Sequence, residues 1–373
     1  MGQFISNVKY ALNRKRLVML GRWKSQHMPI QKMEDPIDFV VTWVDNTDSA
    51  WLTEKKKYEQ QLGVAACLEN NGEERYRDWD FFRYWFRAVE KYAPWVRNVY
   101  LVTYGHIPKW LNTSAPKLRV VNHEDFIPDK YLPVFSSNPI ELNLYRIEGL
   151  SEHFIYFNDD MFLNKPVIPE DFFRGGKPNY AALANPIRND SNCGFDHMRF
   201  TTIGLVNREF TNEISFIMKE HPERWFAKQY GVQIIHNLRA FDDGYLPGMA
   251  FSHLGVPFRK SMMSRAWEDI PSELDQTSRH RFRTDKDVIH QVFSLWEMLK
   301  GEFCPVALEH YGKLFSVSMG KKNEIVDAIQ NEKYRMICIN DNESVSREDY
   351  LMLKEEICKA FEQVLPQKSS FEK

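Results

Sequence analysis

The chain has 373 residues, of which 43% are hydrophobic and 14% aromatic, enough for a sizeable core in one large domain or two modest ones. Its formal net charge of -2 argues against a nucleic-acid partner, because such binders neutralise phosphates with a basic surface. The five cysteines are widely spaced and form no Cys-x-x-Cys pair, which favours reduced thiols in the cytoplasm over disulfides or a zinc site.

Residues 1–30 form a basic N-terminal segment that differs from the rest of the chain. Lysines and arginines are interspersed there with apolar residues such as Leu12, Met19 and Trp23. The pattern predicts an amphipathic helix, with two roles open: attachment to an anionic membrane surface, or packing on the protein body. No apolar run approaches the ~20 residues of a membrane span, and no signal peptide is visible. We therefore expect an intracellular protein with peripheral membrane contact as one option.

From residue 37 onward, strand-like and helical patterns alternate along the chain. A helix is predicted over 78–92, where aromatic residues recur at helical spacing before Ala93-Pro94 ends it. Strands are predicted at 38–44, 98–103, 118–122 and 154–157. The alternation predicts an α/β fold, with a mostly parallel sheet flanked by helices.

The second half of the chain is less regular, and helical insertions are expected there. Further helices are predicted at 209–220, 288–300 and 346–364, a loop at 241–248, and a frayed tail at 366–373. The predicted organisation is a catalytic α/β domain over 31–345, followed by a C-terminal helix and tail over 346–373.

An apolar strand runs directly into Asn158, Asp159 and Asp160. Ligands of open α/β sheets bind where such strands end. Carboxylate and amide oxygens suit Mg²⁺ or Mn²⁺, and a metal held there would neutralise a diphosphate. Taken alone, such a triplet is more often a turn with solvated carboxylates.

Four blocks of sequence set this triplet in a wider pattern. They lie near 37–48, 77–165, 190–210 and 279–290, and a later segment over 337–341 follows them. On these blocks the chain resembles the Stealth family of hexose-1-phosphate transferases, which includes bacterial capsule and surface-polysaccharide phosphotransferases and the lysosomal GlcNAc-phosphotransferase. The resemblance implies a GT-A-like core that binds a nucleotide sugar.

The resemblance also assigns catalytic roles. It implies that Asp159 and Asp160 hold the metal and orient or deprotonate the acceptor, and that His197, in the third block, is the general base. Arg281 and Arg283 are implied to stabilise the diphosphate, since guanidinium groups bind phosphate oxygens. The alternative for the two arginines is a surface cluster paired with nearby aspartates.

Other positions are implied to bind the substrates or complete the metal shell. The residues implied to contact nucleotide, diphosphate, sugar or acceptor are Asp45, Arg77, Asp78, Glu141 and Asn158. For Arg77 and Asp78, mutual pairing is the alternative. Asn340 and Asp341, in the closing segment, are candidate distant metal ligands.

The reaction expected from the resemblance is transfer of a hexose- or N-acetylhexosamine-1-phosphate from a UDP-sugar, with release of UMP. The acceptor would be a polysaccharide or a lipid-linked oligosaccharide, and the cofactor Mg²⁺ or Mn²⁺. The alternative is a metal-dependent glycosyltransferase that releases UDP, since both reactions need a metal at a diphosphate. A third possibility is a non-catalytic scaffold that binds polysaccharide through its many aromatic residues.

Overall fold

The computed structural model describes residues 2–29, 31–63, 79–188, 194–341 and 345–373, with residues 2–9 as backbone only. This part of the chain divides into two compact units. The helical unit comprises Met1–Glu34, Phe172–Phe251 and Asp285–His310, and the sheet unit comprises Asp35–Asp171, Ser252–Thr284 and Tyr311–Lys373. The domain limits predicted from sequence character remain predictions.

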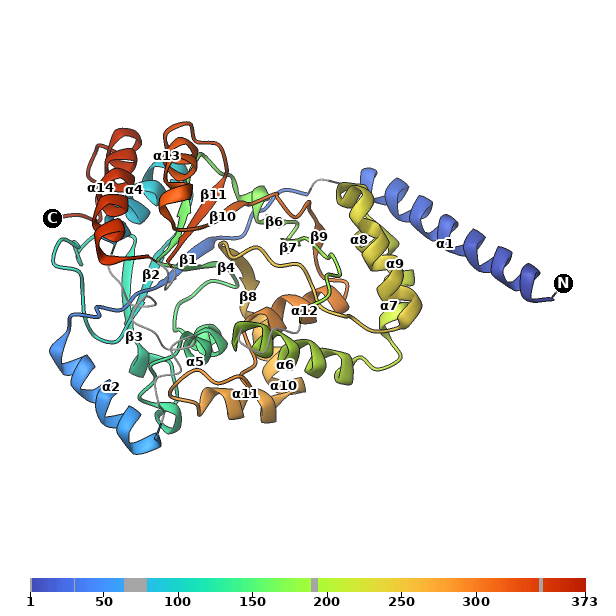
Figure 1. Ribbon diagram of the computed structural model, residues 1–373, viewed down its shortest axis with the longest axis horizontal. Helices are drawn as coiled ribbons and strands as arrows, with labels where there is room; N and C mark the ends of the chain where they lie inside the picture. Colours follow the sequence, from blue (N-terminus) through green and yellow to red (C-terminus); the bar gives the residue numbers. More distant parts are fainter. Residues whose placement is uncertain (1, 30, 64–78, 189–193, 342–344) are drawn as a thin grey trace. The chain divides into compact units, whose positions relative to one another are not determined.

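The sheet unit is built on a five-stranded sheet with the order β3-β2-β1-β4-β8 (Figure 1). Its strands are β1 Ile37–Thr42, β2 Val99–Thr103, β3 Leu118–Asn122, β4 His153–Asn158 and β8 Val256–Arg259. The first four strands are mutually parallel, and β8 runs antiparallel to β4. The predicted α/β class with a mostly parallel sheet is confirmed, and the predicted strands differ from the observed ones by at most two residues at each end.

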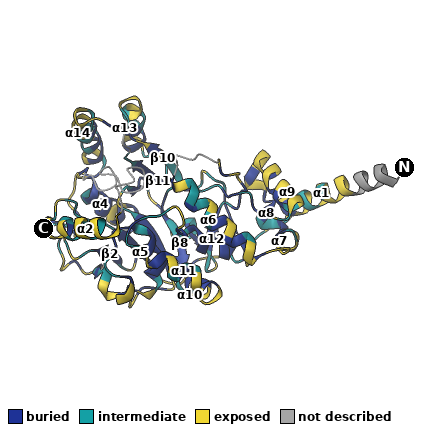
Figure 2. Ribbon diagram, turned by 60° about the horizontal axis from the view of Figure 1, so that its bottom comes forward, coloured by how far each residue is buried: buried dark blue, intermediate teal, exposed yellow. Residues whose placement is uncertain are grey.

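Strands β1 and β4 form the buried centre of this sheet. Both are buried until their last residue and carry apolar runs, 39–41 in β1 and 154–157 in β4, as expected for strands covered on both faces (Figure 2). Their register pairs Thr42 with Asn158. The chain therefore leaves both strands at the same edge, which places the Asn158-Asp159-Asp160 turn at the end of the sheet.

A smaller sheet with the order β10-β11-β5 adjoins this turn in the sheet unit. Its strands are β5 Met161–Leu163, β10 Gly312–Ser316 and β11 Met336–Asn340. The helices of the unit are α2 Ser49–Leu62, α4 Phe82–Tyr92, α5 Ser137–Asn143, α10 Lys260–Asp269, α11 Pro271–Ser278, α13 Lys322–Gln330 and α14 Arg347–Val364. Figure 1 shows α4, α13 and α14 grouped beside β10 and β11.

The helical unit contains α1 Gly2–Gln26, α6 Gly194–Glu209, α7 Ile214–Glu220, α8 Pro222–Trp225, α9 Ile234–Asp243 and α12 Gln291–Leu299. A short sheet of β6 Phe173–Arg174, β7 Lys177–Tyr180 and β9 Cys304–Pro305 completes it. The helix predicted over 209–220 is wrong in its first turn, because α6 ends at Glu209 and α7 starts at Ile214. The loop predicted from residue 241 is also wrong at its start. Helix α9 continues to Asp243 and ends at Gly244, whose φ of 72° suits a glycine cap.

The C-terminal segment is anchored, so the prediction of a frayed tail over 366–373 is wrong. Phe371 is buried, and the Glu372 carboxylate accepts hydrogen bonds from Arg87 Nε at 2.8 Å and Nη2 at 3.0 Å. Arg87 Nη1 also donates to the Leu365 carbonyl. A buried guanidinium on α4 must be paired, and the tail supplies its partner.

We predict that Glu372→Gln lowers the free energy of unfolding by on the order of 2 kcal/mol at pH 7. Burial opposes ionisation of Glu372, but the Arg87 guanidinium and the Ser369 hydrogen bonds outweigh it and hold the carboxyl pKa below its usual value. The stabilisation is therefore present above the unfolded pKa of about 4.3 and is lost as the pH falls through the lower folded pKa. Urea unfolding at pH 7 and at acid pH measures both effects.

The matched control is Glu362→Gln, because Glu362 also pairs with Arg87 but its side chain is 51% exposed. We expect a loss below about 1 kcal/mol there. Equal losses in the two variants would contradict the assignment of Glu372 as the anchor.

Candidate active site

The candidate site is centred on the turn between β4 and β5. Strand β4 ends at Asn158, and β5 starts at Met161, where it pairs antiparallel with β11 opposite Cys338. Ile339 N donates to the Asp160 carbonyl at 2.9 Å, so the backbone of the turn is fixed to β11. A loop before β8 reaches the other side of β4. Three segments that are distant in sequence therefore meet at Asp160.

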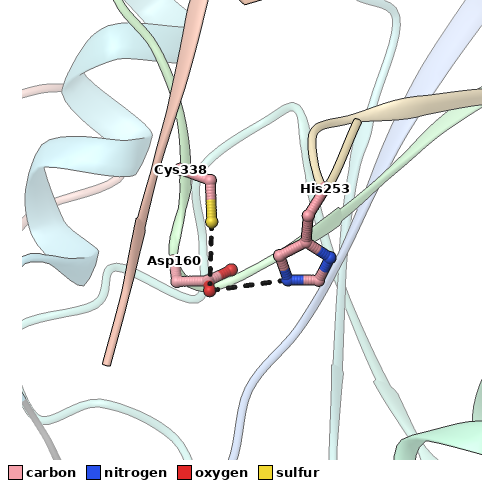
Figure 3. Close-up of side chains that lie close together, drawn as sticks. All are labelled: Asp160, His253 and Cys338. Carbon is pink, nitrogen blue, oxygen red and sulfur yellow. Dashed lines mark hydrogen bonds and ion pairs between the residues drawn. The ribbon is translucent and has the colours of Figure 1, made fainter. Parts of the chain in front are cut away.

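The Asp160 carboxylate lies between β11 and this loop (Figure 3). Its Oδ2 accepts hydrogen bonds from Cys338 Sγ at 3.2 Å and from Asn340 Nδ2 at 3.1 Å. His253 Nε2 lies 3.6 Å from the same oxygen. The Oδ1 atom is buried and has no hydrogen-bond partner among the described residues. One carboxylate oxygen is thus saturated by donors, and the other is left without one.

His253 reaches the turn because the chain beside it packs unusually close to β4. A Cβ atom on Gly255 would lie 2.6 Å from the Phe157 ring, so only glycine permits this approach. Strand β8 then pairs Val256 with Tyr156. This pairing places the imidazole next to Asn158, whose Nδ2 is 3.5 Å from His253 Nε2.

The charges of this cluster support one another. Burial opposes ionisation of both Asp160 and His253, but their mutual attraction outweighs it, so the pKa of Asp160 is lowered and that of His253 is raised. Burial and the Asp160 carboxylate raise the pKa of the Cys338 thiol well above its usual value. Cys338 is therefore a neutral hydrogen-bond donor and not a thiolate.

A buried hydrogen-bond network extends from this cluster under the sheet edge. Tyr156 is 1% exposed, and its hydroxyl lies 2.6 Å from Asn158 Oδ1, 3.0 Å from Glu141 Oε1 and 3.1 Å from Thr42 Oγ1. Burial and the Glu141 charge raise the Tyr156 pKa, so the phenol stays protonated. Its one proton can be donated either to Asn158 Oδ1 or to Glu141 Oε1, and Asn158 in turn lies against His253.

These residues fit a hard divalent cation better than a soft one. Asp160 Oδ1 is a buried carboxylate oxygen without a donor, and Asp159 adds an exposed carboxylate on the adjoining residue. Asn340 donates through Nδ2, which leaves its amide oxygen as a further hard ligand. Cys338 contributes one thiol beside these oxygen atoms, and its Sγ donates to Asp160 Oδ2. Asp160, His253 and Cys338 place ligand atoms within 4.8 Å of one another.

Two other predicted residues take part in local contacts at this end of the sheet unit. Asp45 Oδ1 accepts hydrogen bonds from Thr47 N at 2.8 Å and Thr47 Oγ1 at 2.6 Å. Asp341 Oδ2 accepts one from Trp79 Nε1 at 3.0 Å. Both side chains thus shape loops that follow strands, and their roles in nucleotide or metal binding stay predictions.

Arg281 and Arg283 flank Phe282, which is buried in a cluster with Trp51 and Phe135. Arg281 Nη2 donates to the Leu132 carbonyl at 3.1 Å, and Arg283 Nη2 donates to Ser137 Oγ at 3.0 Å. Among the residues that the structure describes, neither guanidinium has a carboxylate partner, and both Nε atoms are buried without an acceptor. The alternative of a surface cluster paired with aspartates is not observed.

Three further predicted residues, His197, Arg77 and Asp78, stay predictions. His197 lies half-buried on α6 in the helical unit. Arg77 and Asp78 lie outside the described residues. Sequence reasoning did not identify His253, Cys338 or Tyr156. The local sequence offered one signal for His253: it lies two residues before Gly255, which directly precedes β8.

Comparisons with known proteins agree with this assembly. The chain matches Stealth protein conserved region 1 over residues 35–63, conserved region 2 over 75–180 and conserved region 3 over 252–295. Region 3 includes His253, Arg281 and Arg283, and none of the three matched regions covers His197. Regions 2 and 3 each contribute one member of the Asp160–His253 pair.

Curated relatives are similar along nearly their whole length. A capsular polysaccharide phosphotransferase of Streptococcus pneumoniae is 40% identical over 91% of this chain and 100% of its own. A receptor polysaccharide phosphotransferase of Streptococcus gordonii is 38% identical over 91% of this chain and 100% of its own. Among solved structures, a galactosyltransferase with donor and acceptor sugar analogues has a TM-score of 0.36 and 9% identity, covering 87% of this chain and 95% of its own. That score is too low to carry an argument.

We predict that Mg²⁺ or Mn²⁺ raises the thermal unfolding temperature of the protein and that Asp160→Asn abolishes this rise. A ligand that binds the folded state stabilises it by mass action, and the substitution removes the anionic carboxylate. Calorimetry with and without the ion measures the shift. Asp129→Asn, an exposed aspartate of the sheet unit, is the control. Equal shifts in the two variants would contradict cation binding at Asp160.

Proposed function

The chain belongs to the Stealth family of bacterial polysaccharide phosphotransferases, and from this premise we propose that it transfers a hexose- or N-acetylhexosamine-1-phosphate from a UDP-sugar to a sugar hydroxyl. The observation that carries the proposal is the convergence of Asp160 and His253, from two separate family regions, at the end of the parallel sheet. The product is a phosphodiester in a cell-surface polysaccharide.

The reaction is an in-line displacement at the phosphorus nearest the sugar. The acceptor hydroxyl oxygen forms a bond to this phosphorus, and the bond to the bridging oxygen of the diphosphate breaks. The bridging oxygen leaves with UMP, and the hydroxyl proton passes to a base on the protein. The sugar keeps its bond to the transferred phosphate, so its anomeric carbon does not react.

We assign the proton transfer to His253. Its imidazole lies 3.6 Å from the Asp160 carboxylate, which stabilises the imidazolium formed when the ring takes a proton. Tyr156 and Asn158 form a hydrogen-bonded chain that ends beside the ring and restricts its position. His197 remains a second candidate base, on the strength of the sequence prediction.

Asp160, Asp159 and the Asn340 amide are the residues that would hold Mg²⁺ or Mn²⁺. When bound, the ion would neutralise negative charge on the diphosphate. Arg281 and Arg283 carry positive charge without a carboxylate partner among the described residues and would stabilise phosphate oxygens. Asp45 and Glu141 are proposed on the nucleotide and sugar side, and Arg77 and Asp78 at the diphosphate.

The acceptor is proposed to be a polysaccharide or a lipid-linked oligosaccharide. Acceptors built on lipid carriers are held at a membrane surface, so peripheral membrane contact and a cytoplasmic location belong to the same proposal. The second candidate function is a glycosyltransferase that releases UDP. The carboxylate and metal features of the site serve either reaction, because both act on a nucleotide diphosphate sugar.

The released nucleotide tests the choice between these reactions. Purified protein is incubated with UDP-sugars, Mg²⁺ or Mn²⁺ and an extract of polysaccharide or lipid-linked acceptor, and nucleotides are separated by chromatography. We expect acceptor-dependent release of UMP. Acceptor-dependent release of UDP would overturn phosphoryl transfer and establish glycosyl transfer.

We further predict that His253→Ala lowers kcat by about 10²–10⁴-fold, because a positioned base contributes that factor. Tyr156→Phe should lower it by about 10–100-fold, since it keeps the ring but breaks the link between Glu141 and Asn158. The exposed His236→Ala is the control and should retain full activity. Full activity of His253→Ala together with a large loss in His197→Ala would transfer the base role to His197.

A further inference from the structure

Helix α1 has two opposite faces, and only one of them packs on the protein. On the packed face, Gly21 is so close to α8 that a Cβ atom there would lie 2.4 Å from the Pro222 carbonyl oxygen. Ser25 Oγ accepts a hydrogen bond from Lys228 N at 3.0 Å, and Arg14 pairs with Asp242 at 3.2 Å. These contacts recur at helical spacing and fix the orientation of the helix within its unit.

The opposite face carries an exposed apolar stripe. Leu12, Met19 and Trp23 are spaced so that they lie on one side of the helix, and they are 51%, 61% and 59% exposed. Leu20 flanks them at 42% exposure. Figure 2 shows long exposed stretches along α1. Large apolar side chains gathered on one face mark an interaction surface.

The charge of the helix identifies what this stripe contacts. Residues 2–26 contain no Asp or Glu, whereas the whole chain has a formal net charge of -2. Lys15 and Arg16 are exposed beside the stripe and form no ion pair among the described residues. A second copy of such a cationic face would repel the first. An anionic surface with an apolar interior complements it, and tryptophan favours the boundary between the two.

We propose that the exposed face of α1 docks the protein on an anionic lipid bilayer. The helix lies in the plane of the surface, with Leu12, Met19 and Trp23 inserted at the headgroup boundary and Lys15 and Arg16 against lipid phosphates. None of the helices in the described part of the chain combines the length and apolar character that a bilayer crossing requires. The attachment is therefore peripheral. The docking does not depend on the proposed function. Only its biological role, access to a lipid-linked acceptor, rests on that function.

Vesicle co-sedimentation of the full chain tests this docking. Vesicles of phosphatidylcholine alone are compared with an equal mixture of phosphatidylcholine and phosphatidylglycerol. We expect binding to the mixed vesicles that is at least about tenfold stronger than to the neutral ones and that weakens with added salt. The double variant Met19→Ser/Trp23→Ser should bind the mixed vesicles at least about tenfold less, with an unchanged thermal unfolding temperature.

Leu351→Ser is the matched control, because Leu351 is 59% exposed on α14 and lies in the other compact unit. It should bind as the parent protein does. Equal binding of the parent and the double variant, or no binding to mixed vesicles, would overturn the proposal. A dimer detected by light scattering and abolished in the double variant would assign the stripe to self-association instead. Phosphotransfer to a soluble acceptor should be unchanged in the double variant, so failure of docking and failure of the proposed chemistry are distinguishable.

Discussion

The position of the Asp160 carboxylate depends on hydrogen bonds from β11, and the rest of the candidate site is arranged around it. Cys338 and Asn340 donate to one carboxylate oxygen, and the Ile339 amide holds the backbone of the same residue. With that oxygen saturated, the second one is the atom left for an incoming cation. The same carboxylate attracts the His253 imidazole. In the proposed mechanism, one side chain thus links metal binding to proton transfer.

Local sequence predicted the site residues whose position depends on β4 alone. The apolar run before Asn158 determines both the burial of β4 and the position of Asp159 and Asp160 at its end. His253 was not predictable in this way. It reaches Asp160 only because β8 pairs antiparallel with β4 and Gly255 permits close approach to Phe157. Gly255 and β8 follow His253 closely in the sequence, but their partners Phe157 and β4 lie far earlier in the chain, so the local sequence does not reveal the contact.

The C-terminal tail is a second case in which local sequence did not reveal a contact with a distant residue. Its polar composition and terminal position predicted fraying, but the buried Arg87 guanidinium requires a partner and Glu372 supplies it. The four parallel strands of the central sheet were predicted well, because a continuous apolar run is a local signal, whereas β8 was not predicted. Helix α14 was predicted to within one residue at each end. Contacts between distant segments decided the cases where prediction failed.

In the proposed reaction, phosphorus and not the anomeric carbon is the atom attacked. This assignment is tested most directly with a UDP-sugar labelled at the phosphorus nearest the sugar and a competent acceptor. Phosphoryl transfer predicts that this phosphorus becomes part of the acceptor product, in a diester that resists phosphatase. Recovery of the labelled phosphorus in released UDP, with the sugar alone on the acceptor, would contradict it.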